Sequence, residues 1–99
     1  MYDPNTVIFS LGKTVLIPRK NFNFTIVMDC GFFMITEPAI SLHVFAYDEE
    51  SLIHEFAHTI KFLWRCYALE NDNRLVLDAL KVKQCLLSSF EEVAVITEP

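Results

Sequence analysis

The chain has 99 residues, of which 53% are hydrophobic and 13% aromatic, and its formal net charge is −5 at pH 7. This length allows one domain, residues 1–99, with a single core, and the hydrophobic content excludes a disordered chain. Only eight Lys and Arg residues are present, which argues against nucleic acid as a direct partner because phosphate contacts need a basic face. The acidity fits a small basic protein as a partner, and the apolar surplus favours a homo-oligomer.

The three cysteines, Cys30, Cys66 and Cys85, are widely spaced and form no CxxC pair. They are therefore expected to be reduced thiols in a cytoplasmic protein. No apolar segment reaches the about 18 residues that a membrane helix requires, and no leader pattern is present. A membrane is thus not expected among the partners.

The N-terminal part predicts a short tail over residues 1–5 and then a β-hairpin. Residues 6–9 and 14–17 are rich in β-branched and apolar side chains, and Gly12 between them can supply the positive φ of a tight turn. Pro18 ends the second strand because it has no N–H to donate.

A second hairpin is predicted from residues 22–28 and 32–36, with Gly31 at its turn. Glu37-Pro38 breaks the second of these runs, and residues 41–47 form a further alternating strand. Antiparallel strands with one apolar face need a covering layer, which the helices that follow can supply.

The clearest helix in the sequence covers residues 48–69. Asp48 is a good N-cap, and the negative charges of Glu49 and Glu50 suit the first turn. At about 100° per residue one face is apolar and predicted to pack on the sheet. That face consists of Leu52, Ile53, Phe56, Ile60, Leu63, Trp64 and Tyr67, with Ala57 at its margin.

After a polar connector over residues 70–73, a second helix is predicted over 74–93, with Lys83 on its apolar stripe. The Lys83 stem could reach an edge, or its ammonium could pair with a carboxylate of a partner. Residues 94–97 fit either a frayed end or a short strand. The expected fold is α+β: an antiparallel sheet of three to five strands, covered on one face by two helices.

The first helix contains His54-Glu55-Phe56-Ala57-His58, which fits the HExxH pattern of zinc peptidases. In that pattern two His side chains one turn apart bind the metal, and the Glu between them is the general base. One hypothesis is therefore a minimal zinc metallopeptidase, with zinc as its cofactor, His54 and His58 as ligands and Glu55 as catalytic base.

The same helix offers a simpler interpretation, in which both imidazoles lie on a solvated or interface face. They share that face with Lys61 and Arg65, next to which a divalent cation is unfavourable. A third ligand from Glu70, Glu91 or Glu92 would require the second helix to cross the polar side of the first. That arrangement would leave the apolar faces of both helices uncovered. The polar face is therefore interpreted as solvated or as an interface, with Lys61 and Arg65 as candidate interaction residues.

Aromatic residues gather on two of the predicted strands, among them Phe45 and Tyr47, together with Phe32 and Phe33. No basic residue is interleaved with them, so packing in the core or at an interface is favoured over base stacking. Phe45 and Tyr47 are accordingly candidate interaction residues. His43, between them and the Pro turn, is expected to be a partly buried histidine that is hydrogen-bonded to backbone.

Between residues 32 and 64 the order of features resembles the HicB family of antitoxins. The features are a strand ending in Glu37-Pro38, an apolar strand over 42–46, the acidic cap Asp48-Glu49-Glu50 and a helix with Leu52, Ala57, Ile60 and Leu63. The resemblance implies a β-β-β-α core related to a partial ribonuclease H fold, without catalytic carboxylates. It also implies a protein that blocks a small basic ribonuclease toxin and often dimerises.

This chain departs from the HicB pattern at three places. The usual Gly is missing at Ala46-Tyr47, the C-terminal part reads as one long helix in place of a DNA-binding module, and the N-terminal hairpin is extra. Neither DNA binding nor any functional residue is therefore carried over. The leading hypothesis is a HicB-like, non-enzymatic interaction module that self-associates and masks a basic partner, and the zinc peptidase is the alternative.

Overall fold

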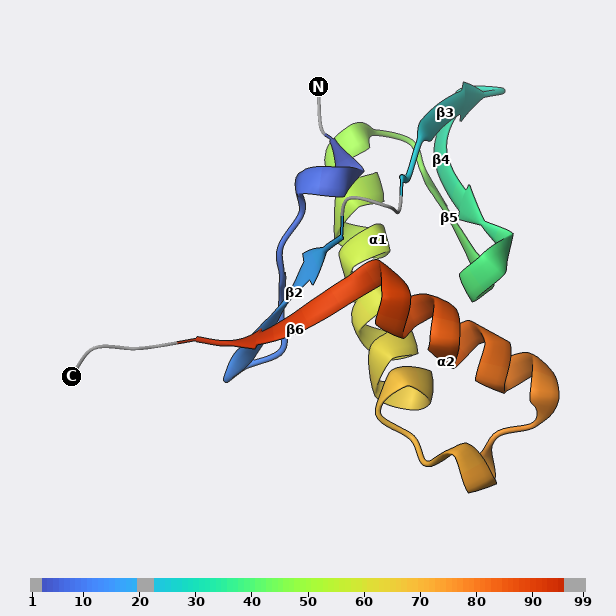
Figure 1. Ribbon diagram of the computed structural model, residues 1–99. Coiled ribbons are helices and arrows are strands. Elements are labelled where there is room, and N and C mark those ends of the chain that lie inside the picture. Colours follow the sequence, from blue (N-terminus) through green and yellow to red (C-terminus); the bar gives the residue numbers. More distant parts are fainter. Residues whose placement is uncertain (1–2, 20–22, 96–99) are drawn as a thin grey trace.

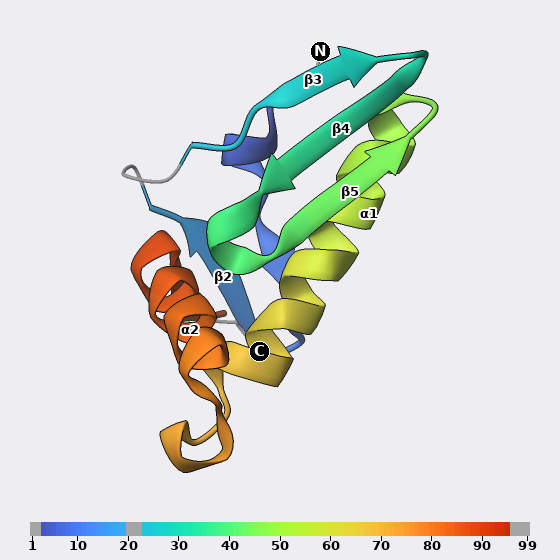
Figure 2. The same cartoon turned by 90° about the vertical axis from the view of Figure 1, so that its right-hand side faces the viewer.

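The computed structural model describes residues 3–19 and 23–95 and has an α+β fold (Figure 1). It contains two three-stranded antiparallel sheets and two α-helices. In Figure 1 helix α1 lies between the two sheets, and the turned view of Figure 2 agrees. No helix in the described part of the chain combines the length and the apolar character that crossing a membrane requires.

The first sheet joins the two ends of the chain, in the order β1-β2-β6. Its strands are β1 (Phe9–Ser10), β2 (Thr14–Pro18) and β6 (Phe90–Ala94). Gly12, with φ +99°, occupies the β1-β2 turn, which confirms the predicted N-terminal hairpin. The first strand is shorter than predicted because residues 4–6 form a 3₁₀ turn.

The second sheet is a meander in the order β3-β4-β5. Its strands are β3 (Ile26–Asp29), β4 (Phe32–Glu37) and β5 (Leu42–Ala46). Cys30 (φ 50°) and Gly31 (φ 83°) form the β3-β4 turn, and the 3₁₀ turn Pro38–Ile40 leads into β5. The predicted second hairpin and third strand are therefore confirmed from Ile26 onward, whereas Phe22 lies outside the described residues.

Helix α1 (Glu49–Leu63) begins as predicted, because the Asp48 carboxylate accepts a hydrogen bond from the Ser51 N–H at 2.7 Å. The helix continues as a wider π-type turn, Trp64–Ala68. The predicted core face is confirmed by burial. The buried residues of α1 are Leu52, Phe56, Ile60 and Leu63, followed by Trp64 and Ala68.

Helix α2 (Leu77–Ser89) is shorter than predicted, and the expectation of helix up to residue 93 is wrong. Residues 90–94 instead form β6, which pairs with β2 in the register Ile17↔Glu91 and Val15↔Val93. Pairing with β2 brings Phe90 into the core, where its ring lies 5.6 Å from that of Phe9. Burial of a Phe together with a new ladder outweighs four more residues of helix.

The single sheet that the sequence predicted is replaced by two separate sheets. The physical reason is β6: it gives β2 a second hydrogen-bonded neighbour, so β2 has no edge left for β3. Helix α1 then packs on both sheets, and one cluster of buried apolar side chains fills the space between them. Helix α2 packs on the π-type turn and on Pro38–Ile40, so the two helices do not share one sheet face.

The Lys83 ammonium binds within the chain. Its Nζ lies 2.7 Å from an Asp72 carboxylate oxygen and donates to the Glu70 carbonyl at 2.6 Å. Lys83 thus links α2 to the connector that precedes the helix. Its charge is paired within the chain, without a carboxylate from a partner.

The prediction of a tail is wrong for residues 3–5, which fold against the rest of the chain. Asp3 caps the 3₁₀ turn Pro4–Thr6, and Pro4 is buried. The Asn5 side chain accepts from the Phe24 N–H at 2.6 Å and donates to the Phe24 carbonyl at 2.8 Å. Residues 1–2 and 96–97, over which the tail and the C-terminal end were predicted, lie outside the described residues.

Candidate functional site

The HExxH residues lie on the exposed side of α1, as the helical wheel predicts. His54, Glu55 and His58 are all exposed, and with Glu50 and Ser51 the first two line only a shallow surface depression of about 300 Å³. Within residues 3–19 and 23–95 no group of three or more His, Cys, Asp or Glu side chains is placed to hold a metal ion. The geometry therefore gives two neighbouring imidazoles without a third ligand.

Two of the three carboxylates considered as third ligands, those of Glu92 and Glu70, are engaged elsewhere. Glu92 accepts hydrogen bonds from the Trp64 indole N–H and from the Thr14 hydroxyl, both at 2.8 Å. Because Trp64 belongs to the core side of the helix, these bonds hold Glu92 away from His54 and His58. Glu70 lies in the connector, where its carboxylate accepts from the Asn71 N–H at 3.0 Å.

Lys61 is half-buried and Arg65 is exposed. Neither forms an ion pair with another residue of the described part of the chain. Both side chains are therefore available to pair with an acidic group of another molecule. Their role in an interaction stays a prediction.

A different surface stands out on the β3-β4-β5 sheet, on the face turned away from α1. We call it the outer face, and it consists of Val27, Phe32, Met34, Phe45 and Tyr47. Its direction follows from alternation: Ile35 and Val44 are paired and buried against α1, so their neighbours Met34 and Phe45, also paired, point outward. Val27 is 50%, Phe45 56% and Tyr47 78% exposed.

The aromatic side chains of the outer face contact one another. The Phe32 ring lies 4.7 Å from Tyr47 and 5.7 Å from Phe45, the latter edge to face. The His43 ring lies 5.9 Å from Phe45, and its Nδ1 shares a hydrogen bond with the Thr36 hydroxyl at 2.8 Å. The expectation of a backbone-bonded, partly buried His43 is wrong, because its strand position points outward. These contacts hold the rings in a fixed, exposed arrangement.

A hollow of about 380 Å³ lies where the outer face meets the start of α1. Its lining combines aromatic rings with two carboxylates and consists of Phe32, Phe45, Ala46, Tyr47, Asp48, Ser51 and Glu55. Aromatic faces and carboxylates together suit the guanidinium or ammonium group of a bound protein. The hollow therefore combines the two kinds of group that bind a cation.

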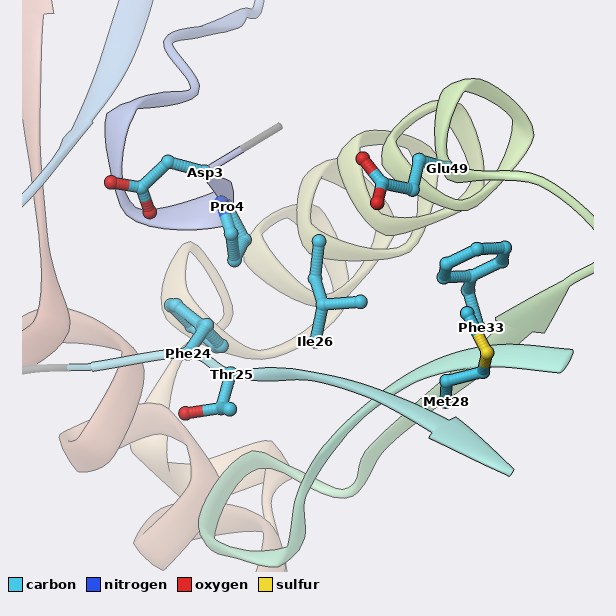
Figure 3. Close-up of a pocket in the computed structure, with 8 residues that line it drawn as sticks. All are labelled: Asp3, Pro4, Phe24, Thr25, Ile26, Met28, Phe33 and Glu49. Carbon is cyan, nitrogen blue, oxygen red and sulfur yellow. The ribbon is translucent and has the colours of Figure 1, made fainter. Parts of the chain in front are cut away.

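A second cavity, of about 530 Å³, opens on the opposite face of the same sheet, beside β3 (Figure 3). It is mainly apolar, and Asp3 and Glu49 are the acidic residues of its lining. Figure 3 shows Ile26 and Phe33 extending from the strands toward the space between the sheet and α1. The lining residues are Asp3, Pro4, Phe24, Thr25, Ile26, Met28, Phe33 and Glu49.

Sequence reasoning found Phe45 and Tyr47 but missed Val27 and Met34 as members of the outer face. The signal that could have found them is the alternation along each strand, which places the Val27 side chain on the other face of the sheet from those of Ile26 and Met28. The cross-strand register that unites Val27, Met34 and Phe45 in one row is visible only in the structure.

Comparison with known proteins gives no relative from which a function could be transferred. No family model, no curated protein and no solved structure matches this chain. The outer face, its hollow and the cavity beside β3 are therefore interpreted from their own chemistry.

Proposed function

We propose that this chain is a cytoplasmic, non-enzymatic protein-interaction module of the HicB-like kind, which masks a small basic protein. The observation that carries the proposal is the exposed set of mutually contacting aromatic rings on the outer face, bordered by carboxylates. Aromatic side chains are enriched at protein interfaces, and Tyr is among the residues that contribute most to binding energy there.

The fold agrees with this proposal in its order of elements. Strands β3, β4 and β5 are followed directly by α1, which is the β-β-β-α order implied by the resemblance to HicB antitoxins. In this arrangement one sheet face is covered by the helix and the other is left for a partner. The additional β1-β2-β6 sheet lies beyond α1 and leaves the outer face uncovered.

The charge of the molecule supports a basic partner. The net charge is −5, and the acidic residues Asp48 and Glu55 line the hollow together with Phe45 and Tyr47. A cationic side chain seated there gains from both the ring faces and the carboxylates, about 0.5–2 kcal/mol for each cation–π contact. Long-range attraction between opposite net charges also speeds the encounter.

The proposal is tested by affinity capture from the cells that contain this protein, with three forms of the tagged chain. They are the wild type, the double variant Phe45→Ala/Tyr47→Ala, and Phe62→Ala as control. Phe62 is exposed to the same extent as Phe45, 58% against 56%, but lies on α1. We expect wild type and Phe62→Ala to retain the same basic protein, and the double variant to bind it at least about tenfold more weakly.

Two results of this experiment would overturn the proposal. One is that no basic protein is retained by the wild type above the background of an untagged control. The other is that the double variant retains the same protein as strongly as Phe62→Ala does, which would place the interface elsewhere on the molecule.

A further inference from the structure

Strand β3 is an edge of the β3-β4-β5 sheet, and within the described residues no strand pairs with its outer side. Its sequence Ile26-Val27-Met28-Asp29 contains neither Lys nor Pro, and its pairing with β4 is continuous, without a bulge. Lys, Pro and bulges are among the features that protect an exposed edge from pairing with another chain, and the one charged residue of β3, Asp29, lies at the end of the strand. The edge of β3 is thus open to a further strand.

The turn that follows β3 determines which backbone groups are available. Cys30 and Gly31 both have positive φ, as a two-residue type I′ turn requires, so Asp29 and Phe32 form a hydrogen-bonded pair. Because hydrogen bonding alternates along an antiparallel strand, Val27 also bonds to β4. The N–H and C=O groups of Ile26 and Met28 therefore point to the open side.

Asn5 confirms this alternation and limits the open edge. Phe24 is two residues before Ile26, and its N–H and C=O both bond to the Asn5 side chain, from the side away from β4. The amide of Asn5 therefore occupies the place that a further strand would take at Phe24. The open edge begins at Ile26, and a pairing that needs the backbone of Phe24 is blocked.

We propose that this edge binds a second copy of the chain, with the two β3 strands antiparallel and Val27 on the two-fold axis. In this register Ile26 of each copy lies opposite Met28 of the other, and both positions have open N–H and C=O groups. Four intermolecular hydrogen bonds form, and none of them needs Phe24, because the residue that falls opposite Phe24 is Cys30, which lies in the turn after β3 has ended. The next register, centred on Ile26, would place Met28 opposite Phe24, whose backbone groups are already bonded to Asn5.

The side chains are self-complementary in the same register. Residues opposite each other share a face of the sheet, so Val27 meets Val27 on the outer face and Met28 meets Ile26 on the inner face. Met28 is 66% exposed in one copy and lines the apolar cavity beside β3. The second copy brings its own Met28 to that cavity, and Asp29 comes to lie opposite the hydroxyl of Thr25, with no carboxylate pair at the seam.

The dimer is a continuous six-stranded sheet in which both α1 helices lie on one side. Its other side joins the two outer faces, with their aromatic clusters distant from the axis because β5 is the far edge of each sheet. Self-association through β3 is therefore compatible with the binding of a basic protein at the outer face. Val27 belongs to both surfaces, but the first proposal is carried by Phe32, Phe45 and Tyr47 and the second by the backbone of β3, so the two can fail separately.

A cysteine at the axis tests the register. In a chain with Cys30→Ser, Cys66→Ser and Cys85→Ala, Val27→Cys is expected to form an intermolecular disulfide under mild oxidation, since opposite residues of a non-hydrogen-bonded pair have Cα atoms about 4.5 Å apart. Thr25→Cys is the matched control, because in this register Thr25 lies opposite Asp29 of the second copy and far from Thr25 of that copy. No crosslink at residue 27, or an equal crosslink at residue 25, overturns the proposed pairing.

Light scattering tests the dimer without crosslinking. Wild type is expected to have twice the 11.5 kDa mass of one chain, whereas Val27→Lys, which places two ammonium groups on the axis, is expected to be a monomer with unchanged circular dichroism. Val27→Thr keeps a β-branched residue and is expected to stay a dimer. A monomeric wild type, or a dimer of undiminished affinity in Val27→Lys, overturns the proposal.

Discussion

At the scale of single residues, the side chains of α1 divide into two groups with opposite expected effects on stability. His54 and His58 are exposed, whereas Phe56 is fully buried and packs edge to face on Phe9 and Phe24. Replacing both histidines with Gln is expected to change the free energy of unfolding by no more than about 0.5 kcal/mol. Phe56→Ala is expected to lower it by roughly 3 to 5 kcal/mol.

Urea denaturation of the variants measures both values. A loss at His54→Gln comparable to that of Phe56→Ala would mean that the imidazole is buried by contacts the structure does not contain. The distinction matters for function, because an exposed pair of histidines without a third ligand has no fixed geometry for a metal.

The zinc hypothesis is tested by metal analysis of protein purified without chelator. We expect less than stoichiometric zinc in the wild type, and no change of thermal midpoint on addition of a chelator, because no described carboxylate or thiol completes the site of His54 and His58. Stoichiometric zinc that is lost in His58→Ala would contradict the proposed function and would restore Glu55 as a candidate base.

Glu92 is a residue whose role could not be anticipated from the sequence. Its carboxylate accepts from the indole N–H of the buried Trp64 and from the hydroxyl of Thr14, and so joins β6 to the π-type turn after α1 and to β2. Glu92→Ala leaves the Trp64 N–H without an acceptor and is expected to cost about 1–3 kcal/mol. Its exposed neighbour Glu91 is the control. Equal stability of the two alanine variants, measured by urea denaturation, would contradict this bridging role.

At the scale of elements, the amphipathic helix and the two hairpins could be predicted because their signals are local. The 3.6-residue period of α1 and the glycines at positions 12 and 31 need no knowledge of distant contacts. β6 was missed because Leu86, Phe90 and Val93 have helical spacing, while pairing with β2 from the other end of the chain decides the structure. Such non-local pairing has no signature within the segment itself.

The contact between Asn5 and Phe24, two residues before β3 begins, is likewise non-local and gives a further prediction. Asn5→Ala removes both bonds to the backbone of Phe24, leaves a partly buried N–H and C=O to find other partners, and is expected to destabilise the protein by about 1–3 kcal/mol. Asn73→Ala, an exposed asparagine in the connector, is the control. If thermal or urea unfolding gives Asn5→Ala and the control the same free energy of unfolding, the Asn5 amide does not stabilise the segment that leads into β3.

At the scale of the whole molecule, the sequence predicted an α+β fold with an apolar surplus but could not divide that surplus between core and surface. The structure makes the division: Phe9, Phe24, Phe56 and Phe90 fill the core, whereas the rings of the outer face stay exposed. The difference arises because α1 covers only one face of the β3-β4-β5 sheet. Composition therefore predicted exposed apolar side chains, and only the strand register could locate them.

Hydroxyl-radical footprinting measures directly whether another protein covers the outer face, because it reports the solvent exposure of individual aromatic side chains. It compares this chain alone with its complex with the basic protein that it captures. We predict that Phe45 and Tyr47 lose most of their reactivity in the complex, while Phe62, equally exposed in the free chain, keeps its own. Undiminished labelling of Phe45 and Tyr47, with protection at Phe62 and the histidine side of α1, would contradict the proposed interface.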